Sequence, residues 1–168
     1  MSSHNTLAMY DNVFPIVAPV DLGGTAAETP YIDLLGVNYC AFLLQQGVTT
    51  PNACGDIVDI TMDTCSVESG GAETAVAFNY RKSSAVTANT WGAVTAATTT
   101  GAELTDDDEG MALWIEVDVE AIAAAGRRYV KLHIEQNAFT AFFASVVAFV
   151  GGRYHQTTMV SATASASA

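Results

Sequence analysis

The 168-residue sequence predicts an all-β protein, a single β-sandwich domain of jelly-roll-like architecture. Three observations lead to this prediction. Apolar segments of strand length recur at fairly regular spacing, and turn clusters rich in Gly, Pro, Asn and Ser separate them. Several of these segments alternate apolar and polar residues, which is the period of a half-buried strand. No segment long enough to form a stable helix shows the period of an amphipathic helix.

Three regions are expected along the chain. Residues 1–30 are predicted to form an extended N-terminal arm, since prolines at 15, 19 and 30 and the pair Gly23–Gly24 interrupt any helical period. The sandwich domain is expected over residues 31–154. Residues 155–168 form a tail of mostly Ala, Ser and Thr. Both the arm and the tail are suited to reach neighbouring molecules.

The first clear strand pattern lies at residues 57–63. Val58, Ile60 and Met62 face one way, and polar side chains alternate with them. Ala75–Tyr80 is the next strand, and the intervening "SVESGGAE" predicts a hairpin between the two. Residues 81–100 follow as a long, weakly charged connection with Trp91 as its expected anchor. Such a segment suits packing on its own sheet or on a neighbouring subunit.

Strand patterns return after residue 111. The apolar face of the first holds Leu113, Ile115, Val117 and Val119, and its polar face holds Trp114, Glu116, Asp118 and Glu120. A short helical turn is expected at 121–125, ended by a glycine at 126. Residues 127–136 alternate again, with valine, leucine and isoleucine at 130, 132 and 134 inward and Lys131 and His133 outward.

Residues 140–150 are apolar at nearly every position. Their β-branched and aromatic content favours a strand. We expect a central strand, or a strand with one face covered by a partner molecule. The period of the apolar residues leaves a buried helix as an open alternative.

Charge is unevenly distributed along the chain. The net charge is −12, yet the part after residue 126 holds four of the six basic residues and one of the 18 acidic ones. A chain this acidic repels phosphates, which excludes nucleic acid as a partner. We predict that the basic segment contacts an acidic partner surface. The residues expected to make that contact are Arg127, Arg128, Lys131 and Arg153.

Cysteines and apolar runs bear on the compartment. Cys40, Cys54 and Cys65 are odd in number and show no Cys-x-x-Cys spacing, so we expect free thiols, with a Cys54–Cys65 bridge left open. The longest apolar run, Ala138–Val150, is too short for a membrane helix, and the N-terminus lacks the pattern of a secretory signal. We therefore expect synthesis in a host cytoplasm and no membrane partner.

No set of residues predicts catalysis or metal binding. The acidic turn Asp106–Glu109 lacks EF-hand spacing, so we interpret it as a solvated turn and leave a loose calcium site open. Glu116 and Asp118 have a spacing suited to a glycosidase pair, but solvent-facing strands commonly carry such acids. No serine lies in a nucleophile-elbow pattern, and the three histidines form no zinc motif. The sequence predicts a protein that is not an enzyme and holds no cofactor or metal.

Trp91 and Trp114, with Tyr80, allow three interpretations. They pack beneath a loop of their own domain, they anchor a protein partner, or they form a platform for a sugar. The first is a common role of Trp. An exposed Trp serves equally in the second, where aromatic residues dominate binding energy.

The order of the parts carries a resemblance to a known family. A strand pair in "YIDLLGVNYCAFLLQQG" and "GDIVDITMDTC" is followed by "NTWGAVT", an acidic turn, "WIEVDVE" and "GRRYVKL". Over residues 31–135 this order resembles that of tailed-bacteriophage capsid decoration, or cement, proteins. The resemblance implies a β-sandwich or jelly roll that oligomerises on the outer face of a capsid. It implies no catalytic residues.

The expected function follows from that resemblance. It is a virion structural protein that binds the major capsid protein and stabilises the head shell by bridging its subunits. We expect a homo-oligomer, a dimer or trimer, on the capsid surface. The alternatives are a tail-tube or head–tail structural protein, and a sugar-binding β-sandwich module that uses Trp91 and Trp114.

Overall fold

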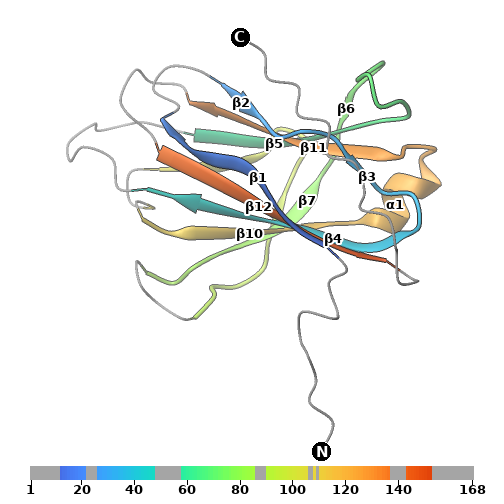
Figure 1. The fold of residues 1–168 in the computed structure, drawn as a ribbon. Coiled ribbons are helices and arrows are strands. Elements are labelled where there is room, and N and C mark those ends of the chain that lie inside the picture. The colour runs from blue at the N-terminus through green and yellow to red at the C-terminus, as the bar shows by residue number, and fades with distance from the viewer. Residues whose placement is uncertain are drawn as a thin grey trace, which may run out of the picture.

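Two antiparallel β-sheets pack face to face in the computed structural model (Figure 1). The structure describes residues 12–21, 26–47, 58–85, 90–105, 108, 110–136 and 143–152. Within these ranges the prediction of an all-β sandwich is confirmed. The elements are β1 (Asn12–Asp21), β2 (Ala27–Glu28), β3 (Ile32–Asp33), β4 (Val37–Gln46), β5 (Val58–Cys65), β6 (Thr74–Ala75), β7 (Phe78–Lys82), β8 (Thr95–Ala97), β9 (Ala102–Leu104), β10 (Ala112–Val117), α1 (Val119–Ala124), β11 (Tyr129–Gln136) and β12 (Phe143–Gly152).

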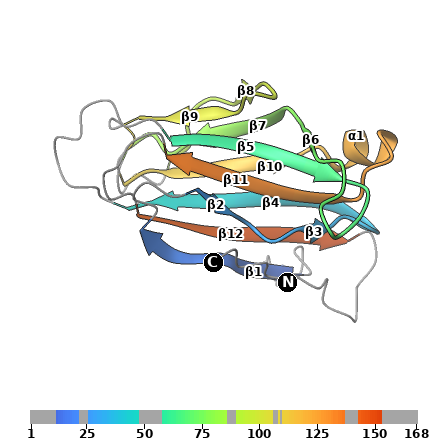
Figure 2. The ribbon, with the colours of Figure 1, turned by 90° about the horizontal axis from the view of Figure 1, so that it is seen from above.

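The strand order is that of a jelly roll. Sheet A runs β1-β12-β4-β10-β7-β8, and sheet B runs β2-β11-β5-β6, with β3 also on β11 and β9 also on β5. The first strand pairs with the last, β2 and β3 pair with β11, and β4 pairs with β10. The chain is therefore a long folded hairpin wrapped around one core, the arrangement of double-sheet jelly rolls. Figure 2 shows β8 and β9 at one edge of the sandwich and β1 at the opposite edge.

The inner faces follow the predicted alternation. In β5 the predicted apolar face is buried, and in β11 the three inward residues are fully buried. In β10 the predicted inward residues are likewise buried against the core. Because strand side chains alternate between faces, these positions fix which residues of each strand point away from the core. The largest fully buried side chains are Phe42, Ile32, Leu44, Ile60, Met62, Leu113, Ile115, Leu132, Ile134, Val130 and Val146.

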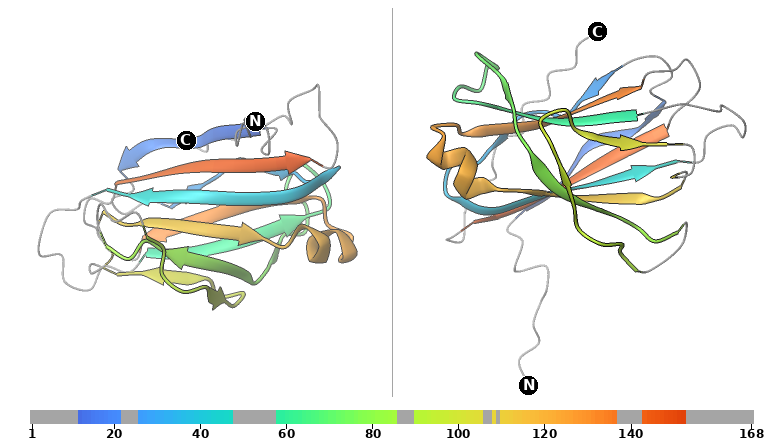
Figure 3. Two further views of the ribbon diagram at one scale, coloured as in Figure 1. Left: turned by 90° about the horizontal axis from the view of Figure 1, so that it is seen from below. Right: turned by 180° about the vertical axis from the view of Figure 1, so that it is seen from behind.

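The hairpin predicted between residues 57–63 and 75–80 is only partly correct. β5 pairs with β6 over two residues, and the chain then crosses to the other sheet. There β7 pairs with β10, and β8 pairs with β7, before β9 returns to β5. Residues 76–101 thus widen sheet A by two strands. Figure 3 shows this crossing from behind, with β7 running between the layers.

The turn between β8 and β9 depends on a glycine. Gly101 has φ +95°, and a Cβ placed there would lie 2.4 Å from the backbone oxygen of Ile60. A side chain at this position would therefore be strained and would also collide with β5. This close approach seats the returning chain on sheet B, and Ala102 and Leu104 beyond it are buried.

The N-terminal arm differs from its prediction. β1 lies within residues 1–30 but pairs along its length with β12, and β2 pairs with β11. The sandwich therefore includes β1 and β2 and does not begin at residue 31. The prolines that break a helix are tolerated here because β1 is an edge strand with irregular register. Residues 1–11 and the predicted tail at 155–168 lie outside the described residues.

The described part of the apolar segment, residues 143–150, lies in β12, so a strand is confirmed there and a helix is excluded. β12 lies between β1 and β4, a central position in sheet A. Ala144, Val146, Ala148 and Val150 are buried in the core. The alternate residues face outward, and the described chain leaves them partly exposed.

The row of carboxylates predicted after Trp114 is not a single strand face. β10 ends at Val117, and Asp118 caps α1 by accepting a hydrogen bond from the Ala121 amide at 2.9 Å. Glu120 lies in the first turn of α1, where the helix dipole interacts favourably with an acidic side chain. Helix capping therefore overrides the strand pattern, and Glu116 and Asp118 do not lie on one face of a single strand.

Candidate functional site

The outer face of sheet A is an almost uncharged surface that crosses the sheet. Strand register places outward residues in two neighbouring rows. One row is Val13, Phe149, Ala41, Glu116 and Asn79; the other is Pro15, Val147, Leu43, Trp114 and Arg81. Among the outward strand residues whose side chains the structure describes, Arg81 and Glu116 are the charged ones. We call this surface the apolar face.

Three aromatic rings form the centre of the apolar face. The Trp114 ring lies 5.1 Å from the Phe149 ring and 6.3 Å from the Trp91 ring, both as centroid distances. Ala41 lies on the outer side of β4 and yet is fully buried. Its small side chain lets rings from the two flanking strands close over it. These spacings are those of stabilising aromatic pairs.

Much of the apolar face remains in contact with solvent. Trp91 is 44% exposed and Val13 is 40% exposed, while Leu43, Val147 and Trp114 are partly exposed. Phe143 and Val94 add two more exposed apolar side chains beside it. A contiguous patch of this kind is typical of a protein-interaction site rather than of an ordinary solvated surface.

The outer face of sheet B has the opposite character. It carries acidic residues on β2, β3, β5, β9 and β11, together with the basic residues of β11. Lys131 of β11 bonds to Glu28 of β2 at 3.0 Å and to Glu73, ahead of β6, at 2.9 Å. The two sides of the sandwich therefore differ sharply in charge.

The basic segment was predicted to contact a partner, and its three described residues, Arg127, Arg128 and Lys131, bond within the chain. Lys131 is only 5% exposed, and its ammonium group lies 5.1 Å from the centre of the Tyr31 ring. Burial lowers the pKa of Lys131, but hydrogen bonds to Glu73 and Glu28 more than offset this, so its pKa is raised. Lys131 is thus an internal tie between β11, β2 and the chain before β6.

The side chains of the two arginines that directly precede β11 also bond within the chain. Arg127 donates to the carbonyls of Thr64 and Ala72, the latter at 2.7 Å. Arg128 donates to the Asp33 carboxylate from Nε and Nη2, with Nε to Oδ1 at 2.6 Å. Burial raises the pKa of Asp33, but the hydrogen bonds from Arg128 and from the Leu35 amide, with the charge of Arg128, outweigh this effect and hold the pKa below its ordinary value. Arg153 lies outside the described residues.

Arg81 is the basic residue that sequence reasoning missed. It is exposed, stands opposite Trp114 in the register of β7 and β10, and forms no ion pair with a described residue. The four other described basic residues all bond within the chain, including Lys82 to Asp108 at 2.7 Å. The apolar residues at 140–150 on both strand faces were the signal that could have located this surface.

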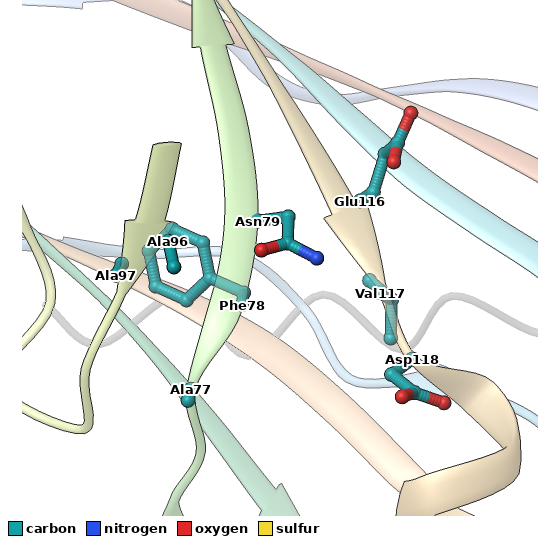
Figure 4. Close-up of a pocket in the computed structure, with 8 residues that line it drawn as sticks. All are labelled: Ala77, Phe78, Asn79, Ala96, Ala97, Glu116, Val117 and Asp118. Atoms are coloured by element: carbon teal, nitrogen blue, oxygen red, sulfur yellow. The ribbon is translucent and has the colours of Figure 1, made fainter. Parts of the chain in front are cut away.

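A pocket of about 420 Å³ borders the apolar face (Figure 4). It lies where β7 diverges from β10, and its polar groups are Asn79, Glu116 and Asp118. Asp118 is committed to capping α1. No third carboxylate joins these two, and the described residues contain no cluster of three metal-ligating side chains.

The other predicted features have simple outcomes. Asp108 of the acidic turn is buried and accepts from Lys82 and from the Thr105 amide, so it is not available as an open calcium ligand. The rest of that turn, with Asp106, Asp107 and Glu109, lies outside the described residues. Cys40 and Cys65 are buried free thiols, and burial raises the pKa of Cys40 to about 12. Cys54 is not among the described residues.

None of the helices in the described ranges is long and apolar enough to cross a membrane. Comparison with protein-family models, curated proteins and solved structures gave no match.

Proposed function

We propose that this protein is a virion structural protein, a capsid decoration or cement protein that binds the major capsid protein on the surface of a phage head. The observation that carries the proposal is the apolar face of sheet A. Its central Trp114 and Phe149, flanked by Trp91 and Arg81, match the residue types that dominate binding energy at protein interfaces. The jelly-roll order fits this proposal, since viral capsid domains use it, but a fold alone does not define a function.

In this proposal the apolar face rests on the shell and the charged face of sheet B meets solvent. Each copy spans the junction between shell subunits and buries surface on both. Internal pressure must then break these added contacts as well as those between the subunits themselves. A stable interface of this kind buries about 800 Å² on each partner, which a six-stranded sheet face is large enough to supply.

The acidic charge supports the same orientation. Free charges cost desolvation energy in an interface, so a docking surface is depleted of them. The described acidic residues lie mainly on sheet B, at β5, β9 and β11 and the strands beside them. Solvated there, they keep a protein of net charge −12 soluble before assembly.

A sugar-binding module is the second candidate, because Trp91 and Trp114 are both on the apolar face. Their rings meet at 60°, so they do not form one flat platform on which a sugar chain would stack. A tail-tube or head–tail protein remains a third expectation, and it would assemble into rings.

Co-sedimentation tests the proposal. Shells are assembled from the major capsid protein of the same phage, mixed with the purified chain and pelleted. We expect saturable binding and a higher temperature of shell disruption. Absence of binding to shells would contradict the proposal. Binding to a glycan array that is lost in Trp91→Ala, without shell binding, would establish the sugar alternative instead.

A further inference from the structure

The edges of the two sheets differ in how they are protected. A free strand edge exposes backbone N–H and C=O groups that readily pair with another chain, and proteins block it with charges, prolines or irregular register. β1, at one edge of sheet A, has two prolines and two register shifts. At the edges of sheet B, β2 and β3 carry Glu28 and Asp33, and β9 carries Glu103. β6, also an edge, is only two residues long, directly follows Glu73 and has the Arg127 guanidinium bonded to Thr74.

β8 is only three residues long, but it has none of the charges, prolines or register shifts that protect the other edges. It forms the other edge of sheet A and pairs with β7 in a regular register. Its residues, Thr95, Ala96 and Ala97, are small and uncharged, and no proline or charged residue occurs from residue 90 to residue 102. Of the sheet edges that the structure describes, β8 is therefore the one open to strand pairing.

The residues beside β8 also favour an interface. Val94, directly before the strand, is 51% exposed, and Trp91 is exposed a few residues earlier. Thr95 and Ala96 are exposed as well. Apolar side chains thus flank an unpaired backbone edge, so that strand pairing would bury both together.

From these observations we propose that β8 pairs antiparallel with β8 of a second copy of this chain, joining two sheets A into one continuous sheet. The charge of the chain indicates why a second copy would pair at this strand. Two copies of a chain with net charge −12 repel each other wherever their acidic surfaces meet. The neutral segment around β8 lets them approach without that cost.

The geometry of such a pair is self-complementary. Antiparallel pairing of one strand with its own copy requires a two-fold axis perpendicular to the sheet, so that each backbone donor meets the equivalent acceptor. With Ala96 at the centre of the three-residue strand, it lies opposite its own copy. Both apolar faces then point to the same side. The dimer follows from the edge alone and does not depend on the proposed shell binding.

Sedimentation velocity of the full chain, from about 1 µM to about 100 µM, tests the pairing over the range in which a weak dimer forms. We expect a monomer–dimer equilibrium in the wild type. Ala96→Lys places a charge on the edge, as natural edge strands do. It should raise the dissociation constant of the dimer at least tenfold, which corresponds to about 1.4 kcal/mol of binding free energy. Ala123→Lys, at an exposed alanine of α1, is the matched control and should dimerise as the wild type does.

A cross-link decides the outcome even if the lysine variant folds poorly. In a Cys54→Ser background, Ala96→Cys should form a covalent dimer under mild oxidation, because directly opposed Cβ atoms lie about 4.5–5.5 Å apart in such a pair. Ala123→Cys should not. A wild type that stays monomeric at every concentration overturns the inference. A dimer that Ala96→Lys leaves unchanged, or that Ala96→Cys fails to cross-link, overturns it too.

Discussion

Replacing Lys131 with Met tests whether the basic segment serves the fold or a partner. The substitution keeps the length and apolar stem of the side chain and removes its ammonium group. That group bonds to Glu28 at 3.0 Å and to Glu73 at 2.9 Å and lies over the ring of Tyr31. Glu28 belongs to β2, Tyr31 directly precedes β3 and Glu73 directly precedes β6, so the lysine ties these segments to β11.

The expected loss of stability is about 1–3 kcal/mol. Removing one partner of a fully buried ion pair costs roughly 3–5 kcal/mol, since it leaves a buried charge without compensation. Here the lysine side chain is 6% exposed, but those of Glu28 and Glu73 are 50% and 36% exposed. Water can therefore hydrate the two released carboxylates, which lowers the cost below that of a fully buried pair.

Urea unfolding followed by far-UV circular dichroism measures this loss. For a domain of this size, about 2 kcal/mol corresponds to a fall in Tm of roughly 4–8 °C. Arg81→Met is the matched control, because Arg81 is exposed and forms no ion pair with a described residue, and it should change stability by less than about 0.5 kcal/mol. If the two variants were equally stable, Lys131 would not be the internal tie that we infer.

Two further predictions concern backbone and pH. Gly101→Ala should lower the free energy of unfolding by about 3 kcal/mol or more, because strain at φ +95° adds to a collision with the Ile60 carbonyl. The control is Gly126→Ala, at φ +72° with nothing within 4 Å, which should lower it by about 1 kcal/mol. Equal losses of stability in urea unfolding would refute the collision. The pKa of Asp33 is lowered in the fold, so its contribution is present above pH ~4 and disappears as the pH falls through the lower, folded value. The stability difference between wild type and Asp33→Asn should therefore shrink as the pH falls below about 4 in parallel urea titrations, and a constant difference would contradict the pairing with Arg128.

The sequence was a good guide to local alternation but not to sheet membership. The inward faces of β5, β10 and β11 follow directly from the period of two. The crossing after Ala75 was missed because a strand pattern does not tell which sheet receives it. β1 was missed because its prolines predict an extended segment equally well as an arm or as an edge strand.

The sequence likewise indicated some features of the candidate site and missed others. Trp91 is exposed, and its role as a partner contact stays a prediction. The apolar segment at 140–150 indicated that one strand face could be covered by a partner. Lys131 was misjudged because its position on the strand predicts an outward direction, whereas the covering residues Glu28 and Glu73 are distant in sequence. Such long-range pairing of charges leaves no local signal.

The central claim is that the apolar face of sheet A, and not another surface, binds the shell. Two valines allow a matched comparison: Val13 lies on that face and is 40% exposed, and Val67 lies in the turn after β5 and is 46% exposed. Both are changed to Asp, and binding to assembled shells is measured by co-sedimentation. We expect Val13→Asp to weaken binding at least tenfold, since it buries a charge without a partner, and Val67→Asp to bind as the wild type does. Equal binding by both variants, or loss in Val67→Asp alone, would contradict the claim.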